Sequence, residues 1–493
     1  MTTARSVRTL AVVAAAMLAV ACSSHAGDDA SDAAVEDTTD DGTTPDTTPD
    51  TTPDTTPDTT PDSSADADST VGDTVADTAV VDEVIDTVAG ETGDEPVGSG
   101  TDGPASLDPV TVAVMYPDVS VAAEFGLAEE VGDYAPLFEA LVDDANARGG
   151  IAGHGIDLQM VEFDLLIEGD AVRACLTATQ DLDAFVVIGL GGVFGDPVVC
   201  VAEQNETLMI QEDGAPDEYY ERADGRLFTL TPSKGETQVA IVDAFADELA
   251  AAPFAVFSSI DTGGDHDAME ASLLPALAAA GLEPAVTVVL DSDGDVAASQ
   301  IPVEVAEVRA AGVETIISTA GFFSTASFAQ ALDGQGIDVR WVGSDAAGFA
   351  SNLYASQIVP TQLDGAGAVT THNLGWQGAG LEEPTVDAAC RARAGELLGT
   401  EIAVDSIDTA GAFAACNFTD LLVAAGELVE GELTTESLAT ALQSVSRIEL
   451  ADYGPAGFAE GDFTAADAVR EITWSAECGC WSAVGEFVPM TGG

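Results

Sequence analysis

Residues Ala147–Asp164 read ARGGIAGHGIDLQMVEFD, and this stretch decides the fold. A helix is expected to end at Asn146 to Arg148, where the glycine pair that follows tolerates the positive φ of a sharp turn. Apolar residues then alternate from Ile156 to Phe163, with the period of a β-strand. The stretch therefore predicts a helix that hands over directly to a strand.

Two elements predicted upstream complete a βαβ unit, with a strand at Val110–Met115 and a helix at Val131–Arg148. Together with the GGIAG run at residues 149–153, this order resembles the opening unit of the periplasmic leucine/isoleucine/valine-binding protein family. The resemblance continues, with gaps, to about Asp462. It implies an α/β fold, the type I periplasmic-binding-protein fold, in which a multi-strand hinge joins two doubly wound Rossmann-like lobes.

The composition describes an acidic protein with enough apolar residues for a large core. Of 493 residues, 46% are hydrophobic, and this length exceeds one ordinary domain, so two lobes are expected. The formal net charge is −74, from 87 acidic against 13 basic residues. Such a surface repels nucleic-acid phosphates and anionic lipid headgroups, so we expect neither as a binding partner.

The N-terminus has the pattern of an exported lipoprotein. Residues 1–21 combine Arg5 and Arg8 with an apolar run that is too short to span a membrane, which indicates a signal peptide. The sequence LAVACS at 18–23 resembles a bacterial lipobox, which implies that Cys22 becomes an acylated N-terminus. The expected location is the outer face of the cell membrane. An ordinary signal peptide with a chance cysteine is the alternative.

Residues 22–107 are expected to form a disordered acidic tether behind that cysteine. The segment repeats Thr-Thr-Pro-Asp five times between Thr43 and Asp62 and contains no aromatic residue. Proline removes amide donors and the aspartates repel one another, so the segment cannot bury a core.

The rest of the chain alternates apolar strands with helical periods, which predicts parallel sheets covered on both faces. We expect the first part of lobe I at 108–232, the first part of lobe II at 233–345, and a return to lobe I with a second crossover and a C-terminal hairpin at 346–493. Gly365–Thr371 is expected as the strand that returns to lobe I, and Tyr453–Phe463 resembles the family's C-terminal glycine-rich hairpin. The remaining predicted strands are Ala184–Ile188, Thr207–Ile210, Leu227–Leu230, Phe254–Ser258, Ala285–Leu290, Thr315–Ser318 and Val339–Val342.

Six cysteines remain beside Cys22, an even number that suits an oxidising compartment. Their neighbourhood in the sequence favours three disulfides, although other connectivities stay open. The first of these resembles the bridge in the same place in the leucine-binding family. A zinc site is the competing interpretation of Cys-Gly-Cys, but no histidine lies near it, so no metal is expected. The favoured pairs are Cys175 with Cys200, Cys390 with Cys416, and Cys478 with Cys480.

Open α/β sheets bind ligands beyond the carboxyl ends of their strands, where helix N-termini offer amides. In lobe I this points to the loops that begin at Tyr116, Gly189 and Gln211. In the family the second and third loops hold a ligand carboxylate, and the matching positions here lack the expected Ser and Thr. Their absence and the acidic pair Glu212-Asp213 favour a cationic or polar ligand. The predicted ligand contacts in lobe I are Gly191, Gly192, Asp213, Gly214 and Ala215.

In lobe II, the corresponding loops contain Thr262, Phe322, Phe323 and Asp345. The two phenylalanines occupy the place of the family's paired tyrosines, an aromatic wall over the ligand, or they serve only in packing. Asp345 occupies the place of the family's acidic residue that accepts the ligand ammonium. Thr262 lies in the first of these loops, at 261–267.

Three other motifs favour structure over chemistry. The spacing of Gly189, Gly191 and Gly195 differs from a dinucleotide fingerprint, so no cofactor is expected. The acidic run at 291–295 lacks the glycine and glutamate that a calcium loop requires, which favours a solvated loop. Asp265-His266-Asp267 lacks a nucleophile or metal spacing beside it, so helix capping is favoured over acid/base catalysis.

The resemblance implies a monomeric solute-binding lipoprotein, not an enzyme. It would capture an amino acid, amide or related small molecule between its lobes and deliver it to the permease and ATPase subunits of an ABC-type importer. A ligand-sensing receptor that signals through a separate partner chain is the alternative.

Overall fold

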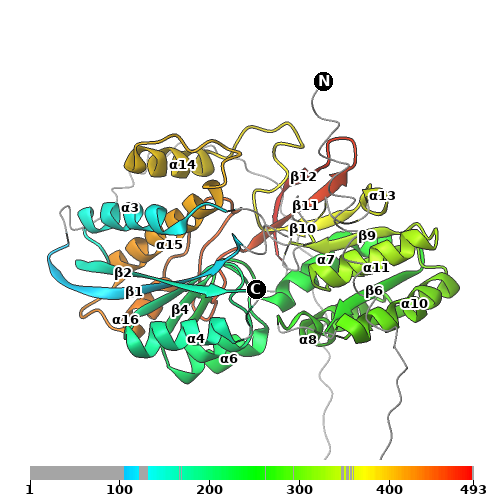
Figure 1. Cartoon of the computed structure of the whole chain (residues 1–493), viewed down its shortest axis with the longest axis horizontal. Coiled ribbons are helices and arrows are strands. Elements are labelled where there is room, and N and C mark those ends of the chain that lie inside the picture. Colours follow the sequence, from blue (N-terminus) through cyan, green and yellow to red (C-terminus); the bar gives the residue numbers. More distant parts are fainter. Residues whose placement is uncertain are drawn as a thin grey trace, which may run out of the picture. The chain divides into compact units, whose positions relative to one another are not determined.

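A computed structural model describes residues 105–120, 131–165, 167, 169–260, 263–291, 294–345, 349–350, 355, 358 and 360–490 (Figure 1). These residues form two α/β lobes, each built around its own sheet. The predicted signal peptide, Cys22 and nearly all of the predicted tether lie outside the described residues. Across the described ranges, no helix combines the length and the apolar character needed to cross a bilayer.

The sheet of lobe I has five strands in the order β2-β1-β3-β4-β5, and every pairing is parallel. The short strands β3 and β4 are buried along their whole length, as expected for a parallel sheet with both faces covered. The strands are β1 (Leu107–Asp118), β2 (His154–Asp164), β3 (Val186–Gly189), β4 (Leu208–Gln211) and β5 (Leu227–Thr229).

Alternate residues of β1 point into two separate cores, because side chains leave a strand on opposite faces. Val112 and Val114 join the core on one face, whereas Ala113 and Met115 join the core on the other. The helices that contribute to the first core are α3 (Tyr134–Ala147), α14 (Thr385–Leu398), α15 (Thr409–Leu428) and α16 (Thr435–Leu442). Those that contribute to the second core are α4 (Asp170–Leu176), the π-helical turn η1 (Thr177–Asp181), α5 (Asp196–Val199), the π-helical turn η2 (Cys200–Gln204) and α6 (Asp217–Ala223).

The helix-to-strand turn forms where the sequence predicts it. Gly149 and Gly150 have φ of 121° and 63°, and the Gly150 amide donates to the Ala145 carbonyl at 2.9 Å. Ile151 and His154 then exchange two backbone hydrogen bonds of 2.9 Å each. Strand β2 begins at His154, two residues before the predicted start, because this tight pair already aligns the chain with β1.

The sheet of lobe II has seven strands in the order β12-β11-β10-β9-β8-β6-β7. Five of them pair in parallel, and the last two, β11 and β12, add an antiparallel hairpin at one edge. The strands are β6 (Phe254–Ser259), β7 (Val286–Leu290), β8 (Thr315–Ser318), β9 (Arg340–Ser344), β10 (Gly367–Thr370), β11 (Ala468–Ser475) and β12 (Cys480–Pro489).

This order corrects two predictions. The strand expected to return to lobe I is β10, which instead pairs with β9 in the lobe II sheet. The predicted hairpin at Tyr453–Phe463 forms only isolated bridges, and the regular hairpin lies further on, in β11 and β12. The physical reason is that the sequence of a short buried strand does not specify which sheet the strand joins. In the lobe II sheet, β10 gains backbone hydrogen-bond partners on both sides.

Helices cover both faces of the lobe II sheet (Figure 1). Buried residues of the strands alternate between two cores, with Phe257 and Trp341 in one and Val256 and Val342 in the other. The first core receives α10 (Gly294–Ala311), α11 (Phe322–Gly334) and α13 (Pro360–Leu363), and the second α7 (Lys234–Leu249), the π-helical turn η3 (Met269–Leu273), which follows α8 (Asp265–Ala268), and α9 (Leu274–Ala279).

The described chain passes between the lobes three times, near residues 230–234, 371–374 and 464–468. The first and third passages lie side by side, since the amides of Ala465 and Ala466 donate to the carbonyls of Thr229 and Leu230 at 2.9 and 3.0 Å. The second is held by Gly454, whose amide donates to the Thr371 carbonyl at 2.8 Å. These passages form the multi-strand hinge that the sequence predicts.

All three predicted disulfides are present. Cys175–Cys200 joins α4 to η2, Cys390–Cys416 joins α14 to α15, and Cys478–Cys480 closes the turn between β11 and β12. The first two disulfides close loops of 25 and 26 residues. In the chain-entropy model, each of these two disulfides stabilises the folded protein by about 3 kcal/mol, less any strain.

Candidate functional site

Four carboxylates gather around one histidine where the passages between the lobes begin. We call Glu212, Asp213, Asp345 and Asp452, with His372, the interlobe carboxylate cluster. Glu212 and Asp213 follow β4 of lobe I, and Asp345 follows β9 of lobe II. His372 follows β10 at the second passage, and Asp452 lies in the loop that pairs with it. The cluster therefore draws on both lobes.

In lobe I, the predicted glycine loop meets the two acidic residues. The Gly191 amide donates to Glu212 Oε2 at 3.2 Å, and the Gly192 amide donates to the Asp213 carboxylate. Gly214 packs so tightly on the first passage that an added Cβ would overlap the Pro232 carbonyl oxygen. Ala215 is buried in the lobe I core. The structure thus brings Gly191, Gly192 and Asp213 together, while ligand contact by all five residues stays a prediction.

In lobe II, Asp345 is held by the end of β10. Its Oδ2 accepts from Thr370 Oγ1 at 2.6 Å and from the Thr371 amide at 3.0 Å. The same oxygen lies 3.9 Å from His372 Nε2. These contacts fix Asp345 at the second passage, beside the carboxylates of lobe I.

His372 joins the two lobes electrostatically. Its Nδ1 lies 3.3 Å from Asp452 Oδ2 and its side chain is 23% exposed. Burial lowers the pKa of His372, but the adjacent Asp452 carboxylate and the charges of Asp345 and Glu212 outweigh burial and raise the pKa to about 10. The imidazole is therefore cationic at neutral pH, and it neutralises part of the cluster.

A pH dependence of stability follows from this pair of contacts. Because the folded-state pKa of His372 lies above the ordinary value of 6.5, its stabilising contribution is complete below pH 6.5 and is lost as pH rises through about 10. The free energy of unfolding should therefore decline between pH 7.5 and about pH 9.5. Denaturant titrations of the wild type and His372→Gln check this, since the variant should show a flatter profile. His154→Gln, at the first residue of β2 and outside the cluster, should keep the wild-type slope. Equal slopes in all three proteins would contradict the assignment.

The pKa of Glu212 is also raised, which favours the neutral form of this acid. Burial and the Asp213 charge raise the pKa of Glu212 to about 7, although His372 and the Gly191 amide oppose the shift. Burial likewise raises the pKa of Asp213, against the charge of Lys234. Lys234, the only lysine in the chain, forms a buried bidentate ion pair with Asp265 at 2.9 and 3.0 Å. The lobe I side of the cluster therefore has more negative than positive charge.

Of the three predicted ligand contacts in the other lobe II loops, the structure describes only the two phenylalanines. Thr262 lies outside the described residues. Phe322 and Phe323 begin α11 with ring centroids 5.2 Å apart, and Phe323 is 58% exposed. Their role as an aromatic wall stays a prediction.

Sequence reasoning missed the aromatic residues that the structure does place at the cluster. The His372 and Tyr453 rings lie 4.5 Å apart between centroids, and the Tyr116 and Tyr134 rings 5.7 Å. Burial and the charge of Glu212 raise the pKa of Tyr134 above its ordinary range, which places Tyr134 within the field of the cluster. Tyr116 and Tyr134 bound the loop that the sequence does single out, whereas His372, Asp452 and Tyr453 have no local motif.

A cavity of about 620 Å³ lies beyond the carboxyl ends of β1 and β2. It is lined by both tyrosines and by Asp118, Asp133 and Glu162, and none of its lining residues is basic. Its size suits a small molecule, and its charge suits a cation or a neutral polar compound.

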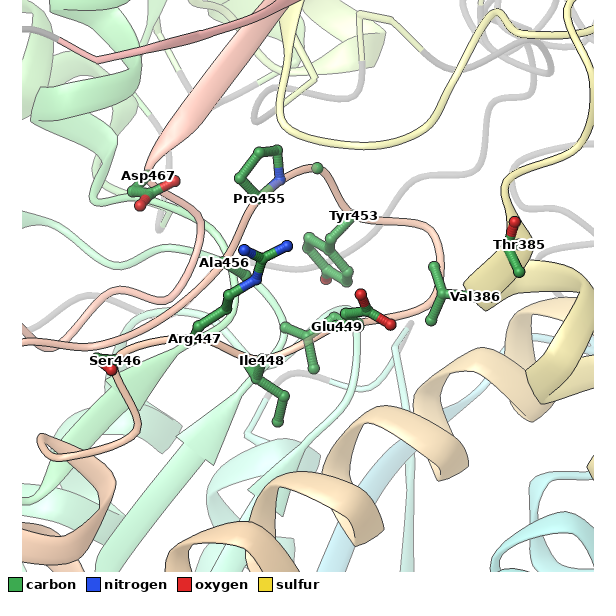
Figure 2. Close-up of a pocket in the computed structure, with 12 residues that line it drawn as sticks. Thr385, Val386, Ser446, Arg447, Ile448, Glu449, Tyr453, Pro455, Ala456 and Asp467 are labelled. Atoms are coloured by element: carbon green, nitrogen blue, oxygen red, sulfur yellow. The ribbon is translucent and has the colours of Figure 1, made fainter. Parts of the chain in front are cut away.

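A second cavity, of about 550 Å³, lies among the loops of lobe I that follow α16 (Figure 2). Arg447 and Glu449 line it, together with Thr385 and Val386 at the start of α14. Tyr453 borders this cavity with its ring, but its hydroxyl is buried. No strand of the lobe II sheet contributes a lining residue, so this cavity does not have the two-lobed character of the cluster.

The Asp265-His266-Asp267 motif has a role that differs from the predicted helix cap. Gly264 occupies the N-cap of α8 and no side chain caps the helix there. Asp265 instead pairs with Lys234, because a buried lysine requires a counter-charge. Within the described residues, no three histidine, cysteine or acidic side chains are arranged to hold a metal ion.

Comparisons with known proteins agree with this architecture. The model of a family described as periplasmic binding protein matches residues 109–477. No curated protein sequence matches the chain.

Solved structures share the fold at low sequence identity. The branched-chain amino acid transporter substrate-binding protein LivJ of Streptococcus pneumoniae, in complex with isoleucine, is 15% identical with a TM-score of 0.56, over 77% of this chain and 99% of that one. A branched-chain amino acid ABC transporter protein of Thermus thermophilus with bound valine is 15% identical with a TM-score of 0.57, over 78% and 98%. An ABC transporter solute-binding protein of Rhodopseudomonas palustris, in complex with 3,4-dihydroxybenzoic acid, is 11% identical with a TM-score of 0.54, over 78% and 98%.

Proposed function

The chain belongs to the periplasmic binding protein family, and from this premise we propose that it is an extracytoplasmic solute-binding protein that captures a small molecule between its two lobes. The observation that carries the proposal is the interlobe carboxylate cluster, which joins side chains of both lobes at the passages between them. Ligand binding between such lobes is coupled to closure about the hinge. The protein delivers the ligand to the permease and ATPase subunits of an ABC-type importer and catalyses no reaction.

The N-terminal sequence supports the location that this function requires. The apolar run and the LAVACS sequence suit export and acylation of Cys22, and the acidic tether that follows suits a flexible link between the membrane and the lobes. The protein works as a monomer at the outer face of the cell membrane. The three disulfides are compatible with an oxidising compartment of this kind.

A thermal-shift screen of the full chain tests the proposal. The panel contains neutral amino acids, amides, diamines and small carboxylates at fixed ionic strength, because a net charge of −74 attracts cations without specificity. A ligand at 100 times its dissociation constant should stabilise the protein by about 2.7 kcal/mol. Calorimetry should then give one site per chain, and small-angle scattering should show a smaller radius of gyration on binding. Absence of any saturable ligand in the panel would contradict solute capture.

A further inference from the structure

In the lobe I glycine loop, the backbone amides that could bind an anionic ligand already donate to carboxylates of the protein. Amides beyond the carboxyl ends of parallel strands bind ligand carboxylates and phosphates. Here Gly191 donates to Glu212 Oε2 at 3.2 Å, and Gly192 donates to the Asp213 carboxylate. A carboxylate on the ligand would therefore find these donors engaged and would face two carboxylates of the protein.

Fewer cations than carboxylates lie near the cluster, and the cations are His372, Lys234 and Arg470, the last of which feels the charge of Asp452. His372 lies between Asp452 and Asp345, at 3.3 and 3.9 Å, and Lys234 is bound to both carboxylate oxygens of Asp265. The carboxylates of Glu212 and Asp213 accept only from backbone amides among their described hydrogen bonds. The cavity lined by Tyr134, whose hydroxyl feels the charge of Glu212, adds Asp118, Asp133 and Glu162 and no basic side chain.

One buried hydroxyl beside the cluster lacks a hydrogen-bond partner. Tyr453 is 4% exposed, and within the described chain no group is hydrogen-bonded to its Oη. The Tyr453 ring lies beside His372, with the ring centroids 4.5 Å apart. Burial raises the pKa of Tyr453 most, and the charges of Glu212, Asp213, Asp452 and Asp345 raise it further, so the phenol lies within the field of the cluster. An unsatisfied buried hydroxyl is costly, and an N–H donor on a ligand would satisfy it.

We infer that the interlobe site takes a small organic cation, an amine or a guanidine without a carboxylate group. Glu212 and Asp213 accept hydrogen bonds from the cationic group, and the Tyr453 oxygen accepts another. The Tyr116–Tyr134 pair, 5.7 Å apart between ring centroids, provides aromatic faces that stabilise a cation. The inference rests on the proposed function and specifies the class of its ligand.

Calorimetry with agmatine and putrescine as cationic probes, and isoleucine and glutamate as carboxylate-bearing probes, tests the inference on the full chain. At least one cationic probe should bind saturably at fixed ionic strength. Glu212→Gln and Asp213→Asn should each weaken that binding about tenfold or more, the effect of losing one charged hydrogen bond. Glu218→Gln, whose carboxylate is 66% exposed on α6, is the matched control and should change affinity by less than about twofold.

Tyr453→Phe separates binding from folding. Removing a hydroxyl that has no partner should leave the unfolding midpoint unchanged or higher, yet weaken binding of the cationic probe several-fold. Weaker binding together with an unchanged midpoint supports the inference. If isoleucine or glutamate binds and neither cationic probe does, the inference is overturned while solute capture stands. If no probe and no member of the thermal-shift panel binds, both fail.

Discussion

Replacing Lys234 with methionine should lower the free energy of unfolding by about 3–5 kcal/mol, because it leaves the Asp265 carboxylate buried without its counter-charge. The two side chains are 5% and 11% exposed, and Lys234 Nζ contacts both Asp265 oxygens at 2.9 and 3.0 Å. Lys234 begins α7 directly after the first passage between the lobes, and Asp265 begins α8 of lobe II. The pair therefore fixes lobe II where the chain enters it. Denaturant unfolding at pH 7 measures the loss.

Two further variants identify the cause of that loss. Lys234→Met combined with Asp265→Asn should recover most of the stability, because no charge is then left buried without a partner. Arg173→Met is the matched control, since Arg173 pairs with Asp170 at 2.7 Å but its side chain is 60% exposed. That change should cost at most about 1 kcal/mol. A double variant as unstable as Lys234→Met alone would assign the loss to packing of the lysine stem.

Gly150→Ala should destabilise the protein by about 3–4 kcal/mol, because alanine disfavours the left-handed backbone at this position and because its Cβ would overlap a backbone atom. Gly150 has φ of 63°, and an added Cβ would overlap the His154 carbonyl oxygen. That oxygen accepts the Ile151 amide at 2.9 Å, so it cannot move without breaking the pair that starts β2. Thermal and denaturant unfolding of the purified variant measure the effect.

Gly312→Ala provides the matched comparison for the glycine turn. Gly312 has φ of 64°, nearly the same as Gly150, but an added Cβ there meets no atom within 4 Å. Its loss should be about 1–2 kcal/mol, the cost of the left-handed backbone alone. Equal losses in the two variants would show that the turn at Gly150 relaxes around the new methyl group.

Part of this protein is determined by the sequence alone, because the physics involved is local. The handover from α3 to β2 depends on two glycines with positive φ and on alternating apolar residues, all within one short stretch. The three disulfides join cysteines that are neighbours along the chain, and they form as predicted. The approach of Gly191 and Gly192 to the acidic pair also follows from sequence, because the carboxyl ends of adjacent parallel strands meet at one edge of a sheet.

Only the tertiary structure decides which sheet a short strand joins and which side chains complete the cluster. Strand β10 is four buried residues, a pattern that fits either lobe, and its place was settled by backbone partners on β9 and β11. His372, Asp452 and Tyr453 have no motif, because their roles depend on contacts between segments that are distant in sequence. The charge balance that favours a cationic ligand appears only when those segments meet, since electrostatic interactions depend on distance in space and on burial.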